Sequence, residues 1–126
     1  MVDLRLASTV GAAAEARRAL EALTGELSAG RRRDVELLVS ELVTNAVRHA
    51  GLRADEEIQL RAGVASGTMR VEVHDPGRGF EPHEPRPDSS RASGWGLFLV
   101  AELADRWGVE REDGTRVWFE IDRDGR

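Results

Sequence analysis

The chain has 126 residues, which suits one domain with a single hydrophobic core, so we expect residues 1–126 to form one domain. Hydrophobic residues make up 40% and charged residues 33%, as in folded soluble proteins, and no apolar run could span a bilayer. A net charge of −5 argues against broad binding to nucleic acid, and the N-terminus lacks a secretion signal. We therefore expect a cytoplasmic protein with neither nucleic acid nor membrane as a direct partner.

The absence of two residue types, Cys and Lys, excludes several chemistries. The sequence has no Cys, which excludes disulfides, thiolate metal sites and cysteine nucleophiles. All 18 basic residues are Arg, so the chain has no Lys. A P-loop and a eukaryotic-type protein kinase site each need a Lys beside the phosphates, and a Schiff base needs a Lys amine, so none of these can be built.

The first predicted elements are a short strand over residues 2–8 and a long helix after it. Ser8 or Thr9 can cap this helix, because short hydroxyl side chains accept hydrogen bonds from the first free N–H groups. The helical pattern continues to about Leu27.

The second predicted helix covers residues 31–50 and has the most regular pattern in the chain. At the helical period its apolar residues fall on one broad arc that must pack against another element: Val35, Leu38, Val39, Leu42, Val43 and Ala46. Gly51 follows as a stop signal. We interpret Arg31–Arg33, ahead of this pattern, as a solvated helix start rather than a nucleic-acid patch.

Two strands are predicted next, at residues 56–65 and 67–75. The tight connection at Ser66-Gly67 is typical of a hairpin, so the strands should be antiparallel neighbours. The Pro- and Ser-rich segment 81–93 is predicted to be a mobile loop. A loop of this length is uncommon in a small domain unless it is functional, although an idle surface insertion is the alternative.

The last elements are a helix over residues 94–107 and a hairpin that turns at Asp113-Gly114. The hairpin joins strands at 107–112 and 115–122. The helix should direct several residues inward: Leu97, Leu99, Val100, Leu103 and Ala104. Together the elements predict an α+β fold, a two-layer sandwich in which helices pack on one face of a mostly antiparallel mixed sheet.

Glu41 and Asn45 are the first candidate site residues. They lie one helical turn apart, at the margin of the apolar arc. Polar groups at such a margin need partners, which a ligand or a metal could supply. The alternative is a half-exposed row that continues to His49.

A second motif follows the strand that ends at Asp75. Met69, Val71 and Val73 alternate on one face, and the Asp75 carboxylate closes that apolar row. In the turn that follows, Gly77 and Gly79 permit positive φ and close approach of the backbone to a ligand. The alternative is an ordinary turn with no ligand.

A third motif, Gly94-Trp95-Gly96-Leu97, opens the predicted third helix. Free N–H groups and the helix dipole at such a position can bind an anion, and glycines let a phosphate approach. This motif is weak evidence alone, because a plain loop-to-helix junction explains it equally well.

The three motifs in this order resemble the GHKL superfamily of ATPases and kinases. The pattern is Glu-x-x-x-Asn at residues 41–45, Asp-x-Gly-x-Gly at 75–79 and Gly-x-Gly-Leu at 94–97. Gly114-Thr115 and the strand after it resemble the end of the same fold, with Arg116 where the family often has a second Thr. Residues 41–50 are most similar to the bacterial anti-sigma-factor serine kinases and their short relatives.

The resemblance implies a role for each polar residue of the motifs. Asp75 would accept a hydrogen bond from the adenine amino group of ATP, and the Thr115 hydroxyl would also reach adenine. Asn45 would bind Mg²⁺ through its amide oxygen. Glu41 would be the catalytic general base for a water or a partner hydroxyl.

The resemblance also implies roles for the glycines and the long loop. Gly77 and Gly79 would open space beside the nucleotide. The junction of Gly94, Gly96 and Leu97 would close over the phosphates, together with an ATP lid at residues 80–93.

The implied function is that of an ATP-binding regulator. Such a protein binds a sigma factor, or phosphorylates a small anti-anti-sigma partner of the STAS type on Ser. The resemblance allows a homodimer but does not require one. Two alternatives remain. One is a non-catalytic, ATP-gated protein-binding module. The other is a metal-dependent hydrolase that uses His49, His74, Asp75 and His83, which strand alternation disfavours because it directs His74 away from Asp75.

Overall fold

The structure is a computed structural model with nine helices and strands in the part of the chain that it describes. It describes residues 1–7, 9–49, 57–76, 91–111 and 114–123, with the backbone alone for 49 and 91–96. The elements are β1 (Val2–Ala7), α1 (Ala12–Ala19), α2 (Glu21–Thr24), α3 (Ala29–His49), β2 (Glu57–Ala65), β3 (Thr68–Asp75), α4 (Arg91–Leu103), β4 (Arg106–Glu110) and β5 (Thr115–Asp122).

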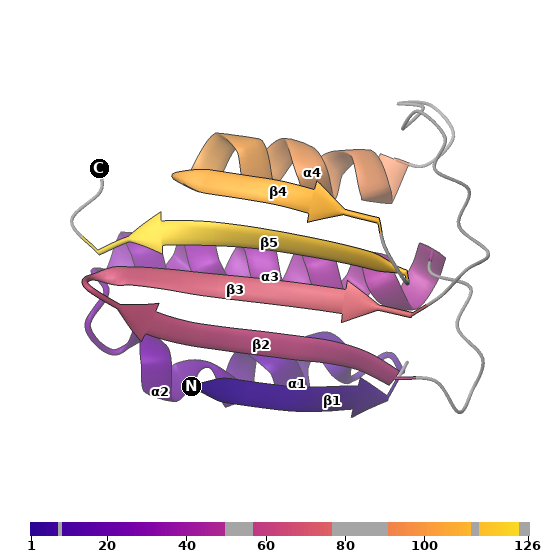
Figure 1. Ribbon diagram of the computed structural model, residues 1–126, viewed down its shortest axis with the longest axis horizontal. Helices are drawn as coiled ribbons and strands as arrows, with labels where there is room; N and C mark the ends of the chain where they lie inside the picture. Colours follow the sequence, from indigo (N-terminus) through magenta and orange to yellow (C-terminus); the bar gives the residue numbers. More distant parts are fainter. Residues whose placement is uncertain (8, 50–56, 77–90, 112–113, 124–126) are drawn as a thin grey trace.

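The strands form one five-stranded sheet, and the helices cover one of its faces (Figure 1). The strand order is β1-β2-β3-β5-β4, and each pair of neighbours is antiparallel. The predicted two-layer α+β sandwich is therefore confirmed, with no parallel pair among the described strands. None of the helices described is both long enough and apolar enough to cross a membrane.

The core lies between the sheet and α3, where two hydrophobic periods meet. All six apolar residues predicted on the arc of α3 are buried. The sheet contributes its alternate residues, as period-two alternation requires: Leu6, Ile58, Leu60, Met69, Val71, Val73, Phe119 and Ile121. At about 25 cal/mol per Å² of apolar surface, this burial is the main force that holds the two layers together.

The predicted first helix is in fact two helices. The chain tightens at Leu20, whose N–H is shared between the carbonyl oxygens of Ala16 and Arg17 at 3.2 Å each. Shared bonds of this kind are typical of a helix end. α1 therefore ends at Ala19, and the short α2 follows it.

The helix predicted at residues 31–50 is α3. It begins at Ala29, two residues earlier than predicted, because Ser28 caps it. The Ser28 hydroxyl oxygen accepts a hydrogen bond from the backbone N–H of Arg31 at 3.2 Å, which is the usual N-cap arrangement. Arg32 and Arg33 are exposed, as expected. The expectation that Arg31 is solvated is wrong, because its exposed fraction is 3%.

The helix predicted at residues 94–107 is α4. It begins at Arg91 rather than at Gly94, and it ends at Leu103 rather than near Trp107. Its end has a visible cause. The backbone N–H of Asp105 donates to the carbonyl oxygen of Glu120 at 2.9 Å, so the chain has already joined β5 there.

Gly114 lets β5 begin directly against the end of β3. Its φ is +101°, and a Cβ added to it would lie 2.0 Å from the carbonyl oxygen of Asp75. Gly67, in the β2–β3 hairpin, has a φ of +79° with no atom within 4 Å of the added Cβ. Both positions favour glycine by conformation, but only Gly114 is also limited by space.

This difference gives a test of the β3–β5 junction. Gly67→Ala should lower the free energy of unfolding by about 1 kcal/mol, because Ala tolerates positive φ poorly. Gly114→Ala should lower it by about 3 kcal/mol or more, because the backbone clash adds to the same conformational cost. Urea unfolding of both variants measures the difference, and equal losses would show that the junction is not tightly packed.

Candidate functional site

The predicted site residues that the structure describes gather at one end of the sandwich. β3 ends there and β5 begins there, and the C-terminal end of α3 lies behind these strands (Figure 1). The N-terminal end of α4 lies at the same end of the sandwich, on the β4 side. The antiparallel register pairs Asp75 of β3 directly with Thr115 of β5. Two motifs forty residues apart in the sequence therefore become neighbours through strand pairing.

Asp75 and Thr115 lie on the helix-covered side of the sheet. Asp75 continues the row of Val71 and Val73, which are 0% and 3% exposed, and is itself half-buried. Thr115 is also half-buried. His74 belongs to the other face, as alternation predicts, so it does not share a site with Asp75.

Asn45 carries the most unusual polar atom among the described residues. Its amide oxygen Oδ1 is buried and has no hydrogen-bond partner among them. The neighbouring Leu42 and Ala46 are 4% and 7% exposed, so the oxygen lies at the edge of the apolar core. A buried acceptor without a partner typically costs about 1–3 kcal/mol, which a bound donor or cation would recover.

The amide oxygen of Asn45 suits a hard metal cation whose other ligands come from outside the protein. An amide oxygen is a suitable ligand for Mg²⁺, which usually keeps water and phosphate oxygens as its other ligands. Among the described residues, no group of three or more His, Asp or Glu side chains could hold a metal without such help. Asn45 therefore fits a metal that arrives with a phosphate ligand better than a metal held by the protein alone.

Glu41 lies one turn before Asn45 on α3 and is half-buried. Neither α3 nor any other described part of the chain supplies its carboxylate with a hydrogen bond or an ion pair that would neutralise it. The spacing predicted from the sequence, with both side chains at the margin of the buried arc, is present in the structure.

The glycine motifs are described only in part. The backbone of Gly94 lies in the first turn of α4, and Gly96 follows in the next turn, with Leu97 half-buried behind them. Gly94 is the fourth residue of α4 and Gly96 the sixth, so the N–H groups without an intrahelical acceptor belong to the residues before Gly94, and the helix begins three residues earlier than this motif predicted. Gly77 and Gly79 lie outside the described residues, as does the predicted lid over residues 80–90. Residues 91–93, the last three of the predicted lid, belong to the first turn of α4.

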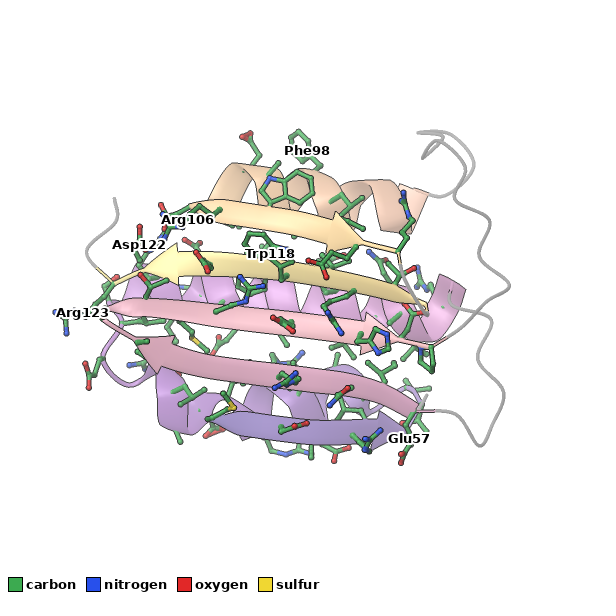
Figure 2. The ribbon with its side chains drawn as sticks, in the orientation of Figure 1. Glu57, Phe98, Arg106, Trp118, Asp122 and Arg123 are labelled. Carbon is green, nitrogen blue, oxygen red and sulfur yellow. The ribbon has the colours of Figure 1, made fainter. Side chains whose placement is uncertain are left out.

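The outer face of the sheet carries a network of charges that the motifs did not predict (Figure 2). Seven residues of β3, β4 and β5 form one chain of alternating ion pairs: Asp122, Arg106, Glu120, Arg70, Glu72, Arg116 and Glu110. Hydrogen bonds from Arg106 lower the pKa of both Glu120 and Asp122. Arg116, the departure from the usual family Thr, is held in this network by Glu110 at 3.2 Å.

Comparison with known proteins identifies the family. A sequence profile of the histidine kinase-like ATPase domain matches residues 6–121, which is nearly the whole chain. The chain belongs to the histidine kinase-like ATPase domain family. The solved blue-light activated histidine kinase of Erythrobacter litoralis agrees, with a TM-score of 0.64 and 36% identity over 77% of this chain and 32% of that chain. The histidine kinase AdeS of Acinetobacter baumannii, at 13% identity and a TM-score of 0.58 over 99% of this chain and 69% of that one, shares the fold.

The relatives include proteins named serine-protein kinase and anti-sigma F factor. The serine-protein kinase RsbW of Bacillus licheniformis is 32% identical over 97 residues, which cover 67% of this chain and 60% of the relative. An anti-sigma F factor of Clostridium botulinum is 34% identical over 95 residues, which cover 67% of this chain and 66% of the relative. This chain thus spans about 60% of the length of the RsbW that it matches. The resemblance seen in the sequence motifs is confirmed.

The unpartnered oxygen of Asn45 predicts an unusual stability effect. Asn45→Ala should raise the free energy of unfolding of the nucleotide-free protein by about 1 kcal/mol, because it removes a buried acceptor and improves helix propensity. Ser40→Ala on the same helix is the control, since the Ser40 hydroxyl accepts a hydrogen bond from Arg17 at 2.7 Å. In Ser40→Ala the loss of this hydrogen bond should offset the gain in helix propensity, so the free energy of unfolding should not rise.

Urea unfolding in nucleotide-free, metal-free buffer measures both variants. Destabilisation by Asn45→Ala of 1 kcal/mol or more would mean that the amide oxygen has a protein partner after all.

Proposed function

We propose that this protein is an ATP-binding regulator of the anti-sigma factor serine/threonine kinase type, with its nucleotide site at the β3–β5 end of the sheet. The observation that carries the proposal is the buried Oδ1 of Asn45, which has no partner among the described residues, together with the Asp75–Thr115 pair at the same end of the fold. Membership of the histidine kinase-like ATPase domain family supports ATP as the ligand. The relatives named serine-protein kinase and anti-sigma F factor support the regulatory role.

The recognition of adenine belongs to the sheet. Asp75 accepts a hydrogen bond from the adenine amino group, and guanine offers no donor in the same place. The Thr115 hydroxyl, directly opposite in the register, provides a second polar contact. Because both residues lie on paired strands, strand pairing fixes these two polar groups relative to each other.

The phosphates belong to the helices. Asn45 is the protein ligand of Mg²⁺, which when bound neutralises phosphate charge. The first turn of α4, which includes Gly94, directs its free N–H groups and the positive end of its dipole toward the phosphates, and Gly96 leaves room beside them. Gly77, Gly79 and the lid that precedes α4 complete the enclosure. In phosphotransfer, Glu41 accepts the proton of the attacking serine hydroxyl and orients that hydroxyl toward the γ-phosphate.

The partners follow from the relatives and remain proposals. We infer that the protein binds a sigma factor, phosphorylates a small anti-anti-sigma protein of the STAS type on Ser, or does both, in the cytoplasm. The alternative is an ATP-gated binding module without turnover. Glu41 favours the catalytic function, because a module that only binds has no chemical need for a carboxylate one turn from the metal ligand.

The adenine assignment predicts a large effect of one isosteric change. Asp75→Asn presents a donor where only an acceptor fits, so affinity for Mg·ATP should fall about a hundredfold, equivalent to 2–3 kcal/mol. The same change at Asp3, exposed on the outer face of β1, should leave affinity unaltered. Titration calorimetry with ATP and GTP tests this, and wild-type affinity for ATP in Asp75→Asn would remove the assignment.

The catalytic assignment predicts that Glu41 separates binding from chemistry. Glu41→Gln keeps size and hydrogen bonding but removes basicity, so the rate of phosphotransfer should fall by roughly 10²–10⁴ with little change in ATP affinity. Glu36→Gln, exposed on the same helix, is the matched control.

The assay measures transfer of labelled γ-phosphate to Ser of a small anti-anti-sigma partner, or ATP hydrolysis when no partner is present. Full activity of Glu41→Gln would overturn the role as base. A wild-type protein that binds ATP but transfers nothing to any such partner would favour the binding module.

A further inference from the structure

Arg31 is the one charged side chain that is buried among the described residues. Its exposed fraction is 3%, although the flanking Arg32 and Arg33 are exposed. A cation is removed from water only at a cost, which its partners must offset. No motif of the nucleotide site includes this residue, so its burial calls for another explanation.

The guanidinium of Arg31 joins three separate parts of the fold. It contacts the carboxylate of Asp105, in the link between α4 and β4. It also donates to the carbonyl oxygen of Leu103, the last residue of α4, at 3.5 Å, and to that of Asp122, the last residue of β5, at 3.3 Å. Asp34, one turn along α3, lies 3.4 Å from Nη1 and adds a second negative charge.

Asp105 completes the junction from the other side. Its carboxylate accepts a second hydrogen bond from the backbone N–H of Asp122 at 2.8 Å. Its own N–H donates to Glu120 at 2.9 Å. The end of α4 is therefore attached both to the sheet and, through Arg31, to the start of α3.

This junction lies at the opposite end of the sandwich from the candidate nucleotide site (Figure 1). Asn45 is fourteen residues beyond Arg31, so α3 connects them as a rigid rod of about 21 Å. Gly94 is nine residues before Leu103, about 14 Å along α4. α3 and α4 pack against each other between these ends.

Apolar contacts between helices permit small axial shifts, and such shifts of about 1–2 Å occur in switching proteins. Directional polar contacts at a helix end resist them. With the C-terminal end of α4 attached to the first turn of α3, the start of α4 takes a defined position along α3.

We propose that Arg31 is a positioning residue for the phosphate half of the nucleotide site. By holding the end of α4 to the start of α3, it sets where Gly94 and Gly96 stand relative to Asn45. The adenine half, on β3 and β5, does not depend on it, because strand pairing fixes Asp75 against Thr115. This inference rests on the nucleotide site proposed above.

The test compares two ligands that use different halves of the site. Mg·ATP needs both halves, whereas adenosine needs only the adenine half. In Arg31→Met, affinity for Mg·ATP should fall roughly tenfold while affinity for adenosine changes less than about twofold. Arg33→Met, at an exposed position two residues further along α3, should change neither affinity.

The measurements are made by calorimetry at a temperature where melting curves show each variant to be fully folded. Arg31→Lys and Asp105→Asn, which remove less of the junction, keep the test open if Arg31→Met does not fold. Arg31→Lys should give an intermediate loss for Mg·ATP, because it keeps the charge but not the planar set of donors.

The outcomes separate the two proposals. Unchanged Mg·ATP affinity in the folded variants, or an equal loss for Mg·ATP and adenosine, would overturn the positioning role and leave Arg31 a purely structural residue. A wild-type protein that binds neither ligand would instead overturn the nucleotide site, and the positioning role with it.

Discussion

At the edge of the buried face of α3, one polar atom has no partner in the described part of the fold. α3 packs its apolar arc against the sheet, yet it carries the Asn45 amide oxygen at the edge of the same buried surface without a partner among the described residues. Folding alone gives no reason to keep such an acceptor, since an apolar residue would cost less there. A ligand that arrives with a cation gives one, and membership of the histidine kinase-like ATPase domain family supports ATP as that ligand. Mg²⁺ is the cation that we propose, because an amide oxygen is a suitable ligand for it.

The two layers of the fold carry different residues of the proposed nucleotide site. Strand pairing brings Asp75 and Thr115 together on the sheet, which suits recognition of a flat base by fixed polar groups. The helices supply Asn45, Glu41 and the first turn of α4, which suits a flexible, charged triphosphate. On the outer face of β3, β4 and β5, three Arg and four acidic residues pair with one another in a single network.

The sequence predicted the parts of this architecture that depend on local periodicity. The arc of α3, the alternation of β3 and both hairpins followed from residue spacing, and the spacing of Glu41 and Asn45 followed from the helix. The break at Leu20 is a local tightening without a Gly or Pro to signal it. The end of α4 depends on the contact of Asp105 with β5, which residue spacing alone could not predict. Arg31 lies one turn before Val35 on the same arc, so its position predicts burial whereas its charge predicts exposure. Its burial depends on hydrogen bonds to Leu103 and Asp105, which are more than 70 residues away in the sequence.

Metal ligation by Asn45 is the point on which the proposed function depends most, and a crystal structure with Mg²⁺ and a non-hydrolysable ATP analogue tests it most directly. The distance from the metal to Asn45 Oδ1 is the quantity to measure. We expect about 2.0–2.1 Å, with phosphate oxygens and water as the other ligands and adenine beside Asp75. A nucleotide bound at this end of the sheet with its metal beyond contact distance of Asn45 would contradict the account.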